Sequence, residues 1–94
     1  MIVISDNCLI GPNVVIRSSN HKFEDKNNLI RNRGHTPGEV ILQEDVWVGA
    51  NSVILPGVEL SRGVVVAAGS VVTKSIPDHT LIAGVPAKII QSRS

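Results

Sequence analysis

The chain has 94 residues, a formal net charge of +1 and a single cysteine. This length allows one domain with a small core. The near-neutral charge argues against a nucleic-acid surface, which needs a basic stripe. A single cysteine excludes an internal disulfide framework. Aliphatic residues are abundant, but Phe23 and Trp47 are the only aromatic residues. Ordinary domains of this size fill their cores with several aromatics, so the composition favours a narrow interior lined by aliphatic side chains.

An aliphatic residue returns at every sixth position of two long stretches. The series is Ile4, Ile10 and Ile16 near the N-terminus, and Leu42, Val48, Ile54, Leu60, Val66 and Val72 further along. A second residue, mostly small or branched, follows each of these by four positions: Cys8, Val14, Asn20, Val46, Ser52, Val58, Val64, Ser70 and Ile76. A period of six matches neither the helical nor the strand period. Hexapeptide self-similarity indicates an all-β fold, a parallel β-helix.

The repeat divides the chain into consecutive segments. Residues 4–21 predict one coil of three hexads, and the polar stretch 22–39 breaks the register and predicts a long excursion loop. Loops of this length inside compact domains are usually functional. Residues 42–77 predict two further coils, and residues 78–91 predict a final irregular coil. The whole chain, residues 1–94, is therefore expected to form one β-helix domain of about three to four coils, with a frayed tail after Ile90.

Stacked coils lie about 4.8 Å apart, so this prism is short and has open strand edges at both ends. Lateral contacts between copies would add buried area, which makes an oligomer more plausible than a monomer. The glycines at positions 11, 49, 57, 63 and 69 suit tight turns with positive φ. No apolar run reaches the length of a membrane span and no signal peptide opens the chain, so we expect a cytoplasmic protein.

Four features together resemble the hexapeptide-repeat acyltransferases: the hexads, His21 just before the loop, the segment Asp45–Ala50 and the segment Ala83–Lys88. The similarity, from Ile4 to about Ile90, is to galactoside, maltose and polysaccharide O-acetyltransferases and to xenobiotic acetyltransferases. It implies a left-handed parallel β-helix and a homotrimer. It also implies that acetyl-CoA lies in a groove between neighbouring prisms and that a histidine acts as general base.

The chain departs from that family at three points. It starts inside a coil, whereas family members have earlier coils that help to bind the acceptor. Gln91 stands where the galactoside enzymes have a basic residue, and Ala50 stands where a serine is common.

His21 is the candidate catalytic residue, because it closes a hexad at a corner beside the long loop. Acyl transfer to a hydroxyl needs a base that works near neutral pH, and an ordinary imidazole, with a pKa of about 6.5, meets that need. A lone histidine is also commonly structural. Glu24 and Asp25 are near enough in sequence to orient the ring or belong to a solvated loop, and His35 and His79 are expected at the surface.

Five residues are candidate cofactor-binding positions. Ala50 and Ala68 are 18 residues apart, so they stack on the outside of a three-sided coil, either as repeat packing or to let a thin ligand approach. The resemblance places the pantetheine arm of CoA there, and the N–H of Ala50 could hold an oxyanion. Thr73, Lys74 and Lys88 match family positions near the CoA phosphates, although surface lysines are ordinarily just solvated.

Trp47 is the candidate substrate-binding residue, either as corner packing or as a flat wall for the acceptor. The function that these residues indicate is an acetyl-CoA-dependent O-acetyltransferase acting on a sugar or other small molecule. The alternative is a non-catalytic trimerising module that has lost its acceptor site. A zinc enzyme resembling the γ-class carbonic anhydrases needs a closely spaced histidine pair, which His21, His35 and His79 do not supply, so no metal is expected.

Overall fold

The computed structural model describes residues 1–18 and 38–93, in which all regular structure is β-strand and turn. The strands are β1 (Ile2–Ile4), β2 (Leu9–Ile10), β3 (Val15–Ile16), β4 (Val40–Leu42), β5 (Trp47–Val48), β6 (Val53–Ile54), β7 (Glu59–Leu60), β8 (Val65–Val66), β9 (Val71–Val72), β10 (Thr80–Gly84) and β11 (Ala87–Ser92). No helix in the described ranges is long and apolar enough to cross a membrane. Most of the predicted excursion loop, at 22–39, lies outside these ranges.

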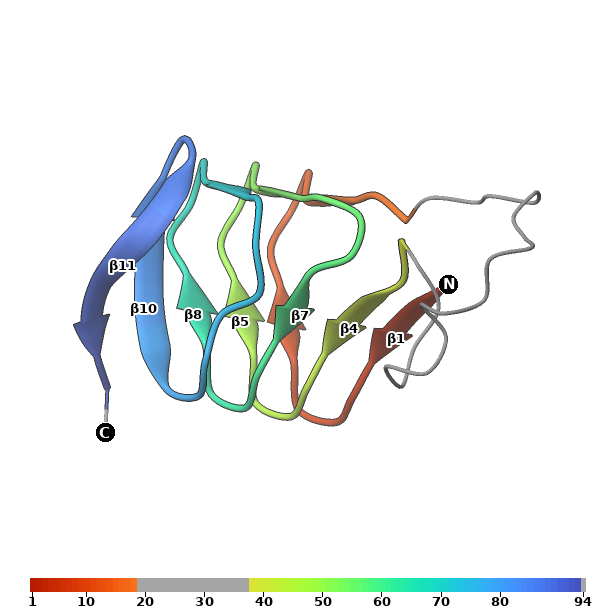
Figure 1. Ribbon diagram of the computed structural model, residues 1–94, viewed down its shortest axis with the longest axis horizontal. Helices are drawn as coiled ribbons and strands as arrows, with labels where there is room; N and C mark the ends of the chain where they lie inside the picture. Colours follow the sequence, from red (N-terminus) through yellow and green to blue (C-terminus); the bar gives the residue numbers. More distant parts are fainter. Residues whose placement is uncertain (19–37, 94) are drawn as a thin grey trace.

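The strands form three sheets that enclose a prism. Sheet A has the order β1-β4-β7, sheet B has the order β11-β10-β8-β5-β2, and sheet C has the order β3-β6-β9. Each turn of the chain therefore visits A, B and C once before it returns one level further along the stack (Figure 1). All pairings except β10 with β11 are parallel. The predicted all-β parallel coil is confirmed.

The six-residue spacing builds the core. The register pairs Leu42 with Leu60, Val48 with Val66 and Ile54 with Val72, so residues 18 apart stack directly. All six aliphatic residues of the series from Leu42 to Val72 are no more than 1% exposed. The residues four positions later, from Val46 to Ile76, are also buried. Both sets therefore point into the prism in these coils.

The N-terminal coil leaves the interior open. Ile4 and Ile10 pair with Leu42 and Val48, yet they are 47% and 40% exposed because they lie at the open end of the described stack. Cys8, Val14 and Ile16 are partly buried and pack against the core. The thiol of Cys8 is free and donates to the carbonyl of Gln43 at 3.2 Å.

Two of the five turn glycines do not have the backbone conformation that the sequence predicts. Gly57, Gly63 and Gly69 have positive φ, as expected, whereas Gly11 and Gly49 do not. A Cβ on Gly49 would lie 2.6 Å from the backbone nitrogen of Ala68, and one on Gly11 would lie 2.8 Å from that of Ala50. These two glycines are needed because the next coil passes too close for any side chain.

The C-terminal segment is more regular than the sequence predicts. β10 pairs with β8 in parallel, as a coil strand would, and β11 then turns back antiparallel to β10. This hairpin stands at the opposite end of the stack from β1 (Figure 1). The prediction of a tail frayed after Ile90 is wrong, because β11 continues to Ser92 and the Arg93 guanidinium donates to the carbonyl of Gly63 at 2.6 Å.

The burial pattern makes a direct prediction for stability. Leu60 is fully buried, so Leu60→Ala should lower the free energy of unfolding by about 2–5 kcal/mol through lost contacts and a residual cavity. Ile90 in β11 is 57% exposed, so Ile90→Ala should change the free energy of unfolding by no more than about 0.5 kcal/mol. Urea denaturation at one fixed protein concentration measures both. Equal effects of the two substitutions would contradict the inward assignment of the six-residue series.

Candidate functional site

A strip of small residues follows the corner between sheets B and C. The register of β5, β8 and β10 sets Ala50, Ala68 and Gly84 at the same level on successive coils. The N–H of Gly69 donates to the carbonyl of Ala50 at 2.8 Å, which ties the two alanine turns together. Pro12 precedes them on the first coil, where its carbonyl accepts from the N–H of Asn51 at 3.0 Å. The sequence-based prediction that Ala50 and Ala68 stack is borne out geometrically.

This strip gives a ligand direct access to the backbone. Ala68 is exposed and Ala50 is partly exposed. Gly49, which precedes Ala50, has no side chain because Ala68 passes close to it. A methyl group is therefore the largest side chain that Ala50 and Ala68 present, so a thin extended chain can lie against this corner.

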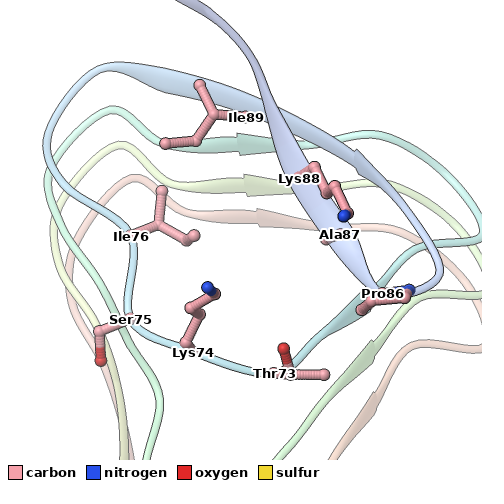
Figure 2. A pocket seen from close by; sticks show the side chains of 8 residues that line it. All are labelled: Thr73, Lys74, Ser75, Ile76, Pro86, Ala87, Lys88 and Ile89. Atoms are coloured by element: carbon pink, nitrogen blue, oxygen red, sulfur yellow. The ribbon is translucent and has the colours of Figure 1, made fainter.

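A pocket of about 450 Å³ opens near the C-terminal end of the prism. Its two walls are the segment after β9 and the start of β11, and the lining residues are Thr73, Lys74, Ser75, Ile76, Pro86, Ala87, Lys88 and Ile89. Figure 2 shows Lys74 extending toward the strand that carries Lys88. Three of the five predicted cofactor-binding residues, Thr73, Lys74 and Lys88, thus line one pocket although 14 positions separate the two lysines.

Hydrogen bonds to β7 hold in place the pocket wall that the segment after β9 forms. The hydroxyl of Ser75 accepts from the N–H of Glu59 at 2.9 Å, and the N–H of Ile76 donates to the carbonyl of Glu59 at 3.0 Å. The amide of Gln43 donates to the Glu59 carboxylate. Ile76 and Ala87 are each 6% exposed and belong to the core cluster, so the base of the pocket is continuous with the interior.

The lining combines positive charge with apolar surface. Among the residues that line the pocket, two are lysines and none is a carboxylate. The hydroxyls of Thr73 and Ser75 add hydrogen-bonding groups, and Ile76, Pro86, Ala87 and Ile89 supply apolar contact. Ammonium groups attract phosphate strongly, so the pocket suits an anionic ligand that also has an apolar part.

The strip and the pocket meet at the β10–β11 hairpin. Gly84, the last residue of β10 and the end of the strip, pairs with Ala87 at the start of β11. Its neighbour Ala83 pairs with Lys88. A ligand that follows the strip past Ala68 therefore reaches the wall that carries Lys88.

Comparison with known proteins agrees with the family and the fold that the sequence predicts. Residues 39–74 match the family described as "Bacterial transferase hexapeptide (six repeats)". The galactoside O-acetyltransferase of Escherichia coli K12 is 37% identical over 90 residues, which are 96% of this chain and 43% of that protein. The chain belongs to the hexapeptide-repeat transferase family.

Solved structures of this family superpose on nearly the whole chain. A maltose O-acetyltransferase from Clostridium difficile 630 matches with a TM-score of 0.79 and 36% identity, over 99% of this chain and 49% of that one. A galactoside acetyltransferase in complex with coenzyme A matches with a TM-score of 0.78 and 35% identity, over 99% of this chain and 46% of that one. The chain spans less than half the length of these relatives.

The remaining predicted site residues are only partly placed. Trp47 lies in β5 with 53% of its surface exposed, between Leu9 and Val65 on the outer face of sheet B. His79 is exposed in the turn before β10. Catalytic candidate His21, with Glu24, Asp25 and His35, lies outside the described residues. Within residues 1–18 and 38–93, no group of three or more His, Cys, Asp and Glu side chains could hold a metal ion.

The sequence did not predict Ser75, Ile76, Pro86, Ala87 or Ile89 as pocket residues. Ser75 directly follows the predicted pair Thr73 and Lys74, so adjacency alone could have added it. Pro86 and Ile89 depend on the antiparallel return of β11, which a repeat of parallel coils does not predict.

Proposed function

We propose that this chain carries the CoA-binding part of an acyltransferase that moves an acetyl group from acetyl-CoA to a hydroxyl of a sugar or other small molecule. The observation that carries the proposal is the continuity between the strip at Ala50 and Ala68 and the pocket lined by Lys74 and Lys88. Names of family relatives, such as the galactoside O-acetyltransferase of E. coli, support this type of reaction and a sugar acceptor.

The residues present fit the parts of CoA. The narrow pantetheine arm suits the strip, where the outward side chains of Ala50 and Ala68 end at a methyl group. The phosphates suit the pocket, where Lys74 and Lys88 supply positive charge and Thr73 supplies a hydroxyl. The solved galactoside acetyltransferase complex with coenzyme A supports this ligand for a chain of the same fold.

The proposed chemistry is direct transfer. His21 takes the proton from the acceptor hydroxyl as the hydroxyl oxygen attacks the thioester carbonyl carbon. The carbon–sulfur bond then breaks, and the sulfur of CoA leaves with the proton returned from His21. The N–H of Ala50, which donates to no backbone carbonyl in the described residues, stabilises the oxyanion that forms between the two steps.

The assembly and the acceptor belong to the same proposal. A homotrimer of left-handed prisms would bring a neighbouring copy against the strip, and the outer faces of the sheets offer apolar contact there. Leu9, Trp47 and Val65 lie side by side on sheet B, and Val15, Val53 and Val71 lie side by side on sheet C. Trp47 is the proposed flat wall for the acceptor. A cytoplasmic location, which the sequence predicts, belongs to the same proposal.

Blocking the strip tests the cofactor assignment. Ala68→Trp places a large ring on the exposed strip and should weaken CoA binding at least about tenfold, measured by isothermal titration calorimetry. The prism should stay folded because the position faces outward. Asp78→Trp is the matched control, since Asp78 is exposed in the turn between sheets A and B, away from the strip. Unchanged CoA affinity in Ala68→Trp would show that the groove lies elsewhere.

Removing the proposed base tests the chemistry. His21→Ala should lower turnover by roughly a hundredfold to ten-thousandfold, the usual contribution of a positioned base. CoA affinity should stay within about twofold, because the proposal gives the ring a role in proton transfer and not in holding the phosphates. The assay follows thiol release from acetyl-CoA over a panel of sugars and small hydroxyl compounds. Near-normal turnover in His21→Ala would refute the base, and CoA binding with no acceptor found for the wild type would favour the non-catalytic alternative.

A further inference from the structure

Two serines in the interior are equivalent positions on successive coils. Ser52 and Ser70 are 18 residues apart, both are 0% exposed, and both follow the strip turns that contain Ala50 and Ala68. Their hydroxyls donate to the same carbonyl, that of Ala67, at 3.1 Å from Ser52 and 2.7 Å from Ser70. The hydroxyl of Ser52 also accepts from the N–H of Ser70 at 3.3 Å. The Ser52 side chain therefore holds the turn from Ala67 to Ser70 against the coil before it, whereas the bond from Ser70 to Ala67 closes that turn on itself.

Only Ser70 also reaches the C-terminal hairpin. Its hydroxyl accepts from the N–H of Gly84 at 3.2 Å. Gly84 pairs with Ala87, and Ala83 pairs with Lys88, so this bond lies at the turn end of the hairpin, next to the wall of the pocket. Ser52, one coil earlier, bonds within the prism alone.

The other end of the hairpin is held at a different corner. The guanidinium of Arg93 donates to the carbonyl of Gly63, and the N–H of Arg93 donates to the carbonyl of His79. Gly63 and His79 lie in turns between sheets A and B, away from the pocket. Among the described residues, the hydroxyl of Ser70 supplies the side-chain hydrogen bond that ties the hairpin turn to the prism near the pocket.

We propose that Ser70 is a positioning residue for the CoA site. Through Gly84 it fixes the wall of Pro86, Ala87 and Lys88 relative to the turn of Ala68, so one buried hydroxyl sets the spacing between the strip and the pocket. Ser70 is 0% exposed, so a ligand on the surface would not contact it directly. The inference rests on the proposed CoA site, since it assigns Ser70 a role in that site's affinity. A wall that shifts by a fraction of an ångström moves the Lys88 amino group relative to the phosphates, which weakens a charge-assisted contact.

Ser70→Ala and Ser52→Ala form a matched pair for the test. Both remove a fully buried hydroxyl that donates to Ala67, but only the first removes the bond to Gly84. We expect Ser70→Ala to weaken CoA binding about fivefold to tenfold, the effect of losing roughly one ordinary hydrogen bond. Ser52→Ala should weaken CoA binding less than Ser70→Ala does, because it leaves the bond to Gly84 in place. Calorimetric titration with CoA measures both, and thermal denaturation checks that the two variants lose similar stability.

Amide hydrogen exchange supplies a readout that does not depend on CoA. Residues 84–88 should exchange faster in Ser70→Ala than in Ser52→Ala, while β4–β7 should exchange alike in the two variants. Equal exchange over residues 84–88, or equal CoA affinity in the two variants, would overturn the positioning role and leave the proposed CoA site intact. A wild-type chain that binds no CoA would overturn the proposed function, and this inference with it.

Discussion

Parallel pairing between residues 18 apart is the constraint on which the rest of this structure depends. Leu42 stacks on Leu60, Val48 on Val66 and Ile54 on Val72, so each coil repeats the inward and outward directions of the one before it. A shift of one residue would turn every buried aliphatic outward. Because the register is fixed in this way, any outward feature that recurs at the same spacing becomes a straight line on the surface. The strip through Ala50 and Ala68 is such a line.

The same constraint explains which parts of the site could be predicted from the sequence. The stacking of Ala50 on Ala68 follows from counting, and the burial of the series from Leu42 to Val72 follows from the period. The role of Gly49 could not be predicted in this way. A Cβ on Gly49 would lie 2.6 Å from a backbone nitrogen on the next coil, so no side chain fits there, whereas the sequence suggests only a turn. The sequence preferences of a turn do not give its distance from the next coil.

The C-terminal hairpin could not be predicted because it ends the repeat. β11 runs antiparallel to β10, and no six-residue series continues through it. The gathering of Thr73 and Lys74 with Lys88 was therefore predicted only through the family resemblance, not from spacing. Pro86 and Ile89 were not predicted at all. Ser70 belongs to the second six-residue series that the sequence shows, but its bond to Gly84 depends on how the hairpin turn sits on the prism. Hairpin geometry therefore turns an ordinary core serine into a candidate positioning residue.

In the proposed function, the repeat register and the hairpin together make one continuous groove for CoA. Chemical-shift mapping by NMR during a CoA titration tests it most directly, because each backbone amide reports its own environment. We expect the largest shifts at Ala50, Ala68, Gly84 and Lys88, with small shifts at Glu44 and Arg62 in the turns between sheets A and B. Large shifts confined to Glu44 and Arg62, or shifts at Lys88 with none at Ala50 and Ala68, would contradict a continuous groove.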